Sequence, residues 1–490
     1  MDGKNILKFF RRYWLVLVLL ITFLLRLPSL FEPISYGDEA IYLTLGGGIR
    51  RGLLLYRDIY DNKPPLLYLL AAIAGNLFWF RFLLLISCLT AIVVMSKLVK
   101  IFFPKNSLSQ KFAVIFFALI SSIPLVEGNN ANSEIFQILP TITAVYLLLK
   151  EEKTTLNWFI AGLLFSLSVL LKVPAIFDFA ALILFIVLFS TKKKFYFSSK
   201  ILVLFLGFIL PVFIVSLYFG LHHQLKLFFK IAFLQNLGYL SSWKTGSHAF
   251  SINNLLKTDF FLKGIFIFLT VMMLWWQKSK LKGLLAFVII WGLFSLFGAT
   301  LSERPYPHYL IQIIPPFTLI LAFVFLKKTR ATLLVPLFSI VLIACTYLRY
   351  HVWRYPTLPY YQNFLAFILG QKDKDSYFSY FNGQLPNYYK VAEEIVLLTT
   401  EKEKIFVWGD DAFLYVLTRR LPAIPFVATY HIKDFYSLGE VAKDLQKSPP
   451  SFIIVKQGSQ PFPQLESILE NKYFKLQKEG SLIVFSKRVN

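Results

Sequence analysis

Apolar residues form long runs along most of the first 350 residues, separated by short polar stretches. Each run is roughly 17–22 residues long, the length at which an α-helix crosses the hydrocarbon core of a bilayer. The sequence therefore predicts a mainly α, polytopic membrane protein with about eleven transmembrane helices. The predicted spans are 13–31, 81–103, 111–127, 134–150, 156–172, 174–191, 201–221, 259–276, 283–301, 308–326 and 331–349.

The segment 64–79 is apolar but short for a spanning helix, and it contains Gly75 and Asn76. If it does not cross the membrane, the basic clusters that follow all lie on the side of the N-terminus, as the positive-inside rule prefers. We therefore expect an amphipathic interfacial helix on the outer face, anchored by Trp79. The N-terminus is then expected on the inner side of the cytoplasmic membrane and the C-terminus on its outer side. The clusters concerned are Lys97 to Lys111, Lys150 with Lys153, Lys192 to Lys200, Lys278 to Lys282, and Lys327 to Arg330.

Residues after about 350 have a different pattern, with short apolar pieces between polar turns. The stretch KIFVWGDDAFLYVLTRRLPAIPFVATY predicts a strand, a turn, a helix and a second extended piece, and PSFIIVKQG and GSLIVFSKR predict further strands. We expect a small extracytoplasmic α/β domain over 351–490. The membrane domain would then cover 1–350, with a first outer loop at 33–80 and a long outer loop at 222–258.

Composition supports a membrane protein, with 57% hydrophobic and 16% charged residues; soluble domains carry about 25% charged residues. The formal net charge of +24 does not indicate a nucleic-acid partner, because the basic residues lie in short clusters between apolar runs. Such clusters suit membrane lipids with anionic headgroups. Cys88 and Cys345 both lie in apolar runs and indicate no disulfide framework.

The first predicted outer loop gathers charges close to the membrane: Asp38, Glu39, Asp58, Asp61 and Lys63. An aspartate here could be only a solvated helix cap. Lys63 precedes two prolines, which suit the first turn of a helix. A lysine at a positive helix start is a poor structural choice but would help to bind an anion.

Further polar residues lie at predicted outer boundaries of the membrane domain. Glu134 opens the fourth span, where it could serve only as a first-turn acid, and Lys172 could extend to the interface or face an anionic headgroup. Arg304 suits bidentate phosphate binding. His308 could orient a substrate or bind a metal, and Tyr309 could belong to an aromatic belt.

Together these residues predict an outward-facing site with one or two carboxylates and two or three cations beside lipid. Transfer of a sugar from a lipid-linked phosphate needs such a set. The leaving phosphate needs positive charge, from Lys63, Lys172 and Arg304, rather than a proton. Asp38, ionised at neutral pH, could be the single base for the acceptor, with inversion at the anomeric carbon. Alternatives are a flippase or transporter of lipid-linked sugars without transfer chemistry, or a non-catalytic assembly protein.

Five motifs carry a resemblance to a known family: YGDEAIY, YRDIYDNKPPLLYLL, NSEIFQ, LLKVPA and RPYPHYLIQIIPP. Over about residues 10–350 the chain resembles the GT-C superfamily of polyprenyl-phosphate-sugar glycosyltransferases. Within it the chain is most similar to glycosyltransferase family 39, which includes protein O-mannosyltransferases and the aminoarabinose transferase of lipid A. In the tail, VWGDDAFLYVLTRR is similar to bacterial members.

The resemblance implies a polyprenyl-phosphate-sugar donor, a protein, lipid or glycan acceptor, and juxtamembrane helices in the first outer loop. It places the acidic residue of that loop at Asp38 with Glu39 beside it, the phosphate-approaching lysine at Lys63, and the second acidic position at Glu134. Arg304 and the His308–Tyr309 pair also match. Asp38, Glu39 and Glu134 could hold a divalent cation, as in some GT-C enzymes, or act without one.

The stretch LGGGIRRG departs from the family pattern. Three consecutive glycines predict a loosened first juxtamembrane helix, because glycine is a poor helix former.

Overall fold

The computed structural model describes residues 3–189, 199–238, 252, 259–277, 283–326, 329–432 and 436–488. The chain divides into two compact units. The helical unit contains residues 1–27 and 83–357, and the loop–tail unit contains residues 28–82 and 358–490. The predicted division at residue 350 is a different one, since it assigns the whole first loop to the membrane domain. The division into domains 1–350 and 351–490 stays a prediction.

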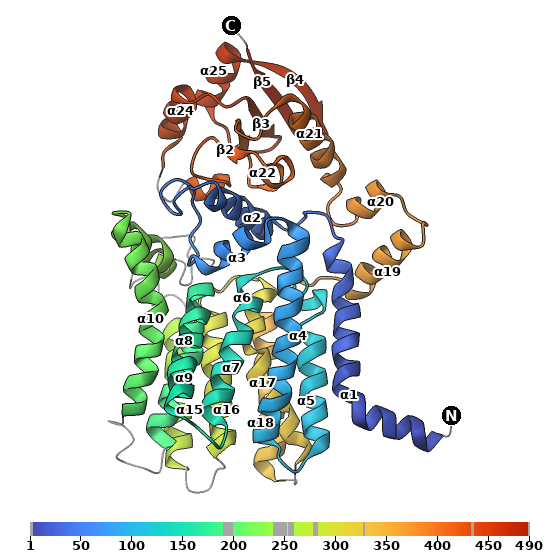
Figure 1. The fold of residues 1–490 in the computed structure, drawn as a ribbon, viewed down its shortest axis with the longest axis vertical. Coiled ribbons are helices and arrows are strands. Elements are labelled where there is room, and N and C mark those ends of the chain that lie inside the picture. The colour runs from blue at the N-terminus through green and yellow to red at the C-terminus, as the bar shows by residue number, and fades with distance from the viewer. Residues whose placement is uncertain are drawn as a thin grey trace. The chain divides into compact units, whose positions relative to one another are not determined.

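Long apolar helices make up the helical unit (Figure 1). In the described part of the chain, five helices are long and apolar enough to cross a membrane and six more are shorter. Each of the eleven predicted spans corresponds to one of them, with ends shifted by a few residues. The helices are α1 (Gly3–Arg26), α4 (Leu77–Phe102), α5 (Ser107–Ile120), α8 (Thr155–Leu171), α9 (Ile176–Phe189), α10 (Ser199–Leu221), α15 (Phe260–Trp276), α16 (Gly283–Ala299), α17 (Ile314–Ala322) and α18 (Arg330–Arg349). The remaining one consists of two consecutive helices, α6 (Ser133–Phe136) and α7 (Ile138–Leu149).

Short helical turns flank several of these helices. They are the 3-10 helices η2 (Pro124–Val126), η3 (Val173–Ala175) and η6 (Pro307–Ile313). Polar residues of interest lie in them or directly beside them: Glu127 follows η2, Lys172 precedes η3, and His308 belongs to η6. The predicted outer loop 222–258 is helical at its start, with α11 (Leu225–Phe229), a π-helix (Lys230–Leu234) and α12 (Gln235–Gly238). Apart from Ile252, the rest of that loop lies outside the described residues.

The segment predicted to lie on the membrane surface is a short helix, α3 (Leu66–Ala74). Gly75 ends it in the left-handed conformation, with φ of 77°. Nine residues reach only about 14 Å at 1.5 Å per residue, which is less than half of a bilayer core. Trp79 belongs to the next helix, α4. The prediction of one helix over 64–79 is therefore wrong, because Gly75 ends α3 before Trp79; the anchoring of this segment by Trp79 stays a prediction.

The glycine-rich segment forms a regular helix, α2 (Gly37–Arg50), so the predicted loosening is also wrong. The reason is the packing of α2 on α3. A Cβ atom on Gly46 would lie 2.6 Å from the backbone nitrogen of Ala72 and 2.7 Å from the carbonyl carbon of Ala71. The absence of a side chain lets the two backbones approach, and this tertiary contact offsets the low helix propensity of glycine.

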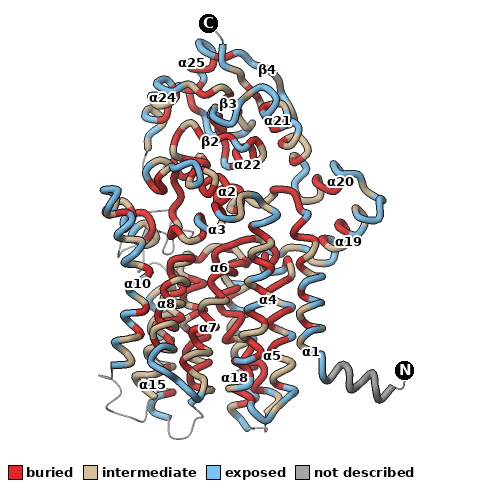
Figure 2. The backbone as a smooth tube through the Cα atoms, in the orientation of Figure 1, coloured by how far each residue is buried: buried red, intermediate tan, exposed pale blue. Residues whose placement is uncertain are grey.

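The tail contains the predicted α/β fold, built on a five-stranded sheet of order β2-β1-β3-β5-β4. β1 pairs in parallel with β2 and β3, whereas β5 pairs antiparallel with β3 and β4. Buried residues concentrate on β1, β3 and α22, whereas β4 is mostly exposed (Figure 2). The strands are β1 (Lys404–Trp408), β2 (Leu421–Pro422), β3 (Phe452–Lys456), β4 (Tyr473–Glu479) and β5 (Leu482–Lys487). The helices are α19 (Thr357–Ile368), α20 (Lys374–Ser379), α21 (Leu385–Leu398), α22 (Phe413–Thr418), α23 (Thr429–Ile432), α24 (Leu438–Lys447) and α25 (Pro463–Lys472).

The first loop packs against the tail within the loop–tail unit. The backbone nitrogen of Tyr60 donates to the carbonyl of Pro425 at 2.9 Å, and the Tyr60 ring lies 5.1 Å from that of Phe426. At the other end of the loop, Tyr360 donates a hydrogen bond to Glu32. The tail therefore fixes the conformation of the loop that carries Asp38 and Lys63.

Candidate functional site

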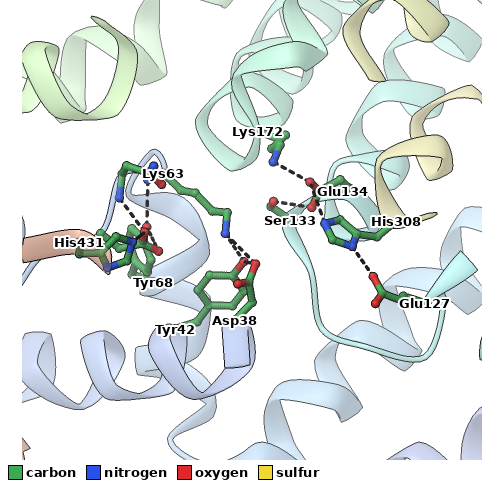
Figure 3. A network of polar contacts seen from close by, with 12 residues as sticks. Asp38, Tyr42, Lys63, Tyr68, Glu127, Ser133, Glu134, Lys172, His308 and His431 are labelled. Atoms are coloured by element: carbon green, nitrogen blue, oxygen red, sulfur yellow. Dashed lines mark hydrogen bonds and ion pairs between the residues drawn. The ribbon is translucent and has the colours of Figure 1, made fainter. Parts of the chain in front are cut away.

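Asp38 and Lys63 meet at the start of α2 (Figure 3). The Nζ atom of Lys63 lies 2.9 Å from Oδ2 of Asp38, and it also contacts the hydroxyl of Tyr42. Tyr42 is one helical turn after Asp38 and donates to the same carboxylate at 2.7 Å. The side chains of Asp38 and Lys63 keep 32% and 17% exposure, so the pair is accessible to a ligand.

The backbone around Lys63 is held by two buried tyrosines. Tyr56 donates to the Lys63 carbonyl at 2.8 Å, and the Lys63 backbone nitrogen donates to the Tyr68 hydroxyl at 3.1 Å. Burial raises the pKa of both phenols well above the usual value, and so does the nearby charge of Asp61. Both therefore stay protonated and can donate. Lys63 is thus presented from a fixed loop just before α3.

Asp61 is buried beneath this loop and connects it to the tail. It accepts from Tyr68 at 2.8 Å and from the Asn62 backbone at 2.7 Å, and its Oδ1 lies 3.3 Å from Nε2 of His431 on α23. Burial opposes ionisation, but the charge of Lys63 and the hydrogen bond from His431 outweigh it and lower the pKa of Asp61. Asp61 is therefore a supporting carboxylate behind Lys63. Sequence reasoning missed His431, since nothing in the local sequence signals this distant pairing.

Glu39 follows Asp38 in sequence but its side chain lies elsewhere. Both of its carboxylate oxygens accept from Arg81, at 2.8 Å and 2.6 Å, and Arg81 also pairs with Glu32 at 2.9 Å. All three side chains are buried. The structure therefore brings Lys63 to Asp38 and not to Glu39, because neighbouring helical residues point in directions about 100° apart.

Asp58 interacts with residues other than Asp38 and Lys63. It pairs with Arg57 at 2.7 Å and accepts from the Leu54 backbone at 2.8 Å, which closes a turn. The hydrogen bond from Arg57 lowers the pKa of Asp58. These contacts are those of a turn-stabilising residue.

The helical unit contains a second cluster, around Glu134 at the start of α6 (Figure 3). Lys172 Nζ lies 2.6 Å from Oε1 of Glu134, and Ser133 donates to Oε2 at 2.8 Å. His308 Nε2 lies 3.9 Å from Oε1, and its Nδ1 contacts Glu127. The sequence-predicted Glu134, Lys172 and His308 are thus brought together. Glu127 was not predicted as a site residue, since its partner His308 is 181 residues away in the chain.

Aromatic rings surround this second cluster. Lys172 lies 4.8 Å from the centre of the Tyr309 ring, and Tyr306 stacks on His308 at 5.6 Å. Arg304 lies over Tyr306, 5.9 Å from the ring centre. Sequence-predicted Tyr309 and Arg304 therefore lie beside the cluster and contact it through rings. Such cation–π contacts hold a cation while leaving it able to bind an anion.

A buried aspartate positions the helical turn that carries His308. Asp178, on α9, accepts from Trp291 at 2.7 Å and Ser295 at 2.6 Å on α16. It also accepts from Gln312 on η6 at 2.7 Å. Three segments are thereby tied together by one hydrogen-bonded carboxylate. Its role is to hold η6, and with it His308, in place.

The described residues contain no group of three or more His, Cys, Asp or Glu arranged to hold a metal ion. The predicted carboxylates already have cationic partners. Both oxygens of Glu39 are taken by Arg81, and Asp38 and Glu134 each have a lysine within hydrogen-bond distance. A lysine beside a carboxylate supplies the charge that a divalent cation would otherwise bring.

Neither a protein-family model nor a curated protein matches this sequence. Among solved structures, the fold is similar to that of ArnT from Cupriavidus metallidurans bound to undecaprenyl phosphate, with a TM-score of 0.59 at 12% identity. That match covers 96% of this chain and 98% of ArnT. The apo state of the same protein matches with a TM-score of 0.57 at 13% identity, covering 97% and 98%. The predicted fold class, a multi-pass helical membrane protein with a small α/β domain, is confirmed.

Proposed function

We propose that this protein is an inverting glycosyltransferase that moves a sugar from a polyprenyl-phosphate donor to an acceptor. The observation that carries the proposal is the contact between Lys63 and Asp38, which joins a cation for a phosphate to a carboxylate that can act as a base. The similarity of fold to ArnT, whose structure contains undecaprenyl phosphate, supports the same donor class.

In the proposed reaction, the acceptor oxygen or nitrogen attacks the anomeric carbon of the donor sugar. The bond from that carbon to the phosphate oxygen breaks, and the phosphate leaves with its electron pair. The acceptor proton passes to Asp38. Lys63 stabilises the charge that develops on the leaving phosphate, and no acid is needed because a phosphate leaves as an anion.

Tyr42 and Asp61 assist Lys63 without reacting. Tyr42 contacts both members of the pair and so fixes the lysine against the carboxylate. Asp61 and Tyr68 fix the backbone from which Lys63 extends. A ligand phosphate would compete with Asp38 for Lys63, and its arrival would release Asp38 to accept a proton.

For the helical unit we propose substrate binding by Lys172, His308, Tyr309 and Arg304, with Glu134 as a further acidic residue of the site. Lys172 keeps 16% exposure of its side chain, whereas Glu134 is almost fully buried. Glu134 would set the position of Lys172, and Lys172 would contact the ligand.

We further propose a hexosyl or pentosyl transferase similar to family 39, acting on the outer face of a cytoplasmic membrane. The positive-inside pattern supports this sidedness. The alternative is a flippase without transfer chemistry. A flippase would have no use for a base beside the phosphate-binding lysine, so the Asp38–Lys63 contact favours the transferase.

The test is transfer from labelled polyprenyl-phosphate sugars by the full-length protein in nanodiscs. Asp38→Asn should lower turnover by about 10²–10⁴-fold, the usual contribution of a positioned base, while donor binding persists. Lys63→Met should weaken donor binding as well. Asp375→Asn, an exposed aspartate of the same unit, serves as the matched control. Undiminished transfer by Asp38→Asn would remove Asp38 as the base. Absence of transfer by the unaltered protein, with movement of the lipid-linked sugar across vesicles intact, would favour the flippase.

A further inference from the structure

A basic cavity lies at the end of α2 away from Asp38. Its volume is about 460 Å³, and it is lined by residues of α2, the end of α3 and the α22–β2 segment of the tail, all within the loop–tail unit. Four arginines border it, Arg50, Arg51, Arg419 and Arg420, against one acid, Glu401. Two of these arginines come from the first loop and two from the tail.

The four arginines differ in how far they are committed to protein contacts. Arg420 is buried, and its guanidinium donates to Thr399 and to the carbonyls of Val396 and Thr418. Arg51 donates to the carbonyls of Glu401 and Arg419, at 3.1 Å and 2.9 Å. Arg51 joins the loop to the tail, and Arg420 stabilises the tail itself, so these two build the cavity rather than serve a ligand.

The other two arginines keep donors for a ligand. Arg50 is exposed and makes one long hydrogen bond, 3.4 Å to the Gly75 carbonyl. Arg419 is exposed, at a position with φ of 57°, and its side chain has no hydrogen bond or ion pair within the described ranges. A guanidinium offers a planar pair of donors that matches two oxygens of a phosphate. Leu43 and Leu421 add apolar wall to the cavity.

We propose that this cavity binds a phosphate monoester group through Arg50 and Arg419. Arg50 is twelve residues after Asp38 on the same helix, about 18 Å along its axis. One phosphate cannot reach both places, so the cavity is a site separate from the Asp38–Lys63 pair. The phosphate comes either from a lipid headgroup or from a soluble phosphorylated compound, and the experiment separates the two.

The experiment measures binding without turnover, so its outcome is independent of the proposed glycosyl transfer. The full-length protein is titrated with glycerol 1-phosphate in detergent. In parallel it is placed in nanodiscs of phosphatidylcholine with or without phosphatidic acid. Phenylglyoxal labelling of Arg50 and Arg419, read by peptide mass spectrometry, reports occupancy at the residues themselves.

Arg50→Gln with Arg419→Gln should weaken binding at least about tenfold, since hydrogen bonds to charged groups are among the strongest. As a control, Lys443→Gln with Lys447→Gln also removes two positive charges, from exposed positions of α24, and should change binding less than about twofold. Arg50→Lys with Arg419→Lys keeps the two positive charges but loses the planar pair of donors. Its binding should be intermediate between that of the two glutamine variants.

Protection of both arginines by glycerol 1-phosphate assigns the site to soluble phosphate esters. Protection only in nanodiscs with phosphatidic acid assigns it to a lipid headgroup. Equal binding by the Arg50→Gln/Arg419→Gln variant and the unaltered protein would overturn the proposal. So would an equal loss in the lysine control, because that would indicate attraction by net charge alone.

Discussion

The imidazole of His431, on α23 of the tail, lies 3.3 Å from the carboxylate of Asp61, two residues before Lys63. Both side chains are buried. Tyr68, near the start of α3, donates a further hydrogen bond to Asp61. A residue of the tail therefore supports the loop that presents the proposed phosphate-binding lysine.

This relationship predicts an acid-sensitive element of stability. The folded chain lowers the pKa of Asp61 below its ordinary value of about 3.9, because Lys63 and His431 outweigh burial. A group with a lowered pKa stabilises the fold fully above its ordinary pKa, and that stability is lost as the pH falls through the lowered value. Asp61→Asn should therefore lower the melting temperature at neutral pH and flatten its decline in acid. Melting curves of the purified protein between about pH 7 and pH 3 would check this. A decline as steep as that of the unaltered protein would contradict it.

The Glu134–Lys172 pair predicts non-additive mutational effects. Breaking a buried ion pair by removing one partner costs about 3–5 kcal/mol, because the remaining charge is left uncompensated. Glu134→Gln and Lys172→Met should each be strongly destabilising, and the double variant should cost clearly less than their sum. Unfolding in SDS of the two single variants and the double variant measures the coupling. Effects that add within about 0.5 kcal/mol would indicate independent residues.

Arg81 and Arg57 provide a matched comparison of a buried and an exposed ion pair. Arg81 is fully buried between Glu32 and Glu39, so Arg81→Met leaves two buried carboxylates facing each other. We expect a loss of at least about 3–5 kcal/mol, seen as poor folding yield or a large fall in melting temperature. Arg57 pairs with Asp58 at the surface, and Arg57→Met should leave melting almost unchanged. Similar melting of both variants would contradict the assigned importance of the buried triad.

Two adjacent glycines on α2 should respond oppositely to alanine. Gly46→Ala places a Cβ against the backbone of Ala71 and Ala72, and overpacking of this kind costs about 1–3 kcal/mol. A Cβ on Gly47 would meet nothing within 4 Å, so Gly47→Ala should stabilise α2 by about 0.5–1 kcal/mol. Melting temperatures of the two variants would check the sign of each effect. A neutral Gly46→Ala would show that α2 and α3 can separate without loss.

The sequence by itself determined the elements whose signals are local. Run length and hydropathy located the eleven apolar spans found in the described residues, and alternation with turn residues located β1, β2, β3 and β5 but not β4. The same local reasoning selected Asp38, Lys63, Glu134, Lys172 and His308, because charged residues beside apolar runs need compensation. In each unit the structure provides that compensation by pairing them, Lys63 with Asp38 and Lys172 with Glu134.

Only the tertiary structure decided which charges meet. Asp38 and Glu39 are equivalent in sequence, yet one pairs with an accessible lysine and the other with buried Arg81. His431, Glu127 and the arginines of the α2 cavity were not predicted, since their partners are far away in the chain. Glycine propensity gave the wrong answer for α2 because close backbone packing outweighs it at Gly46. Local propensities are set by neighbours in sequence, whereas ion pairs and close contacts depend on which surfaces the folded chain brings together.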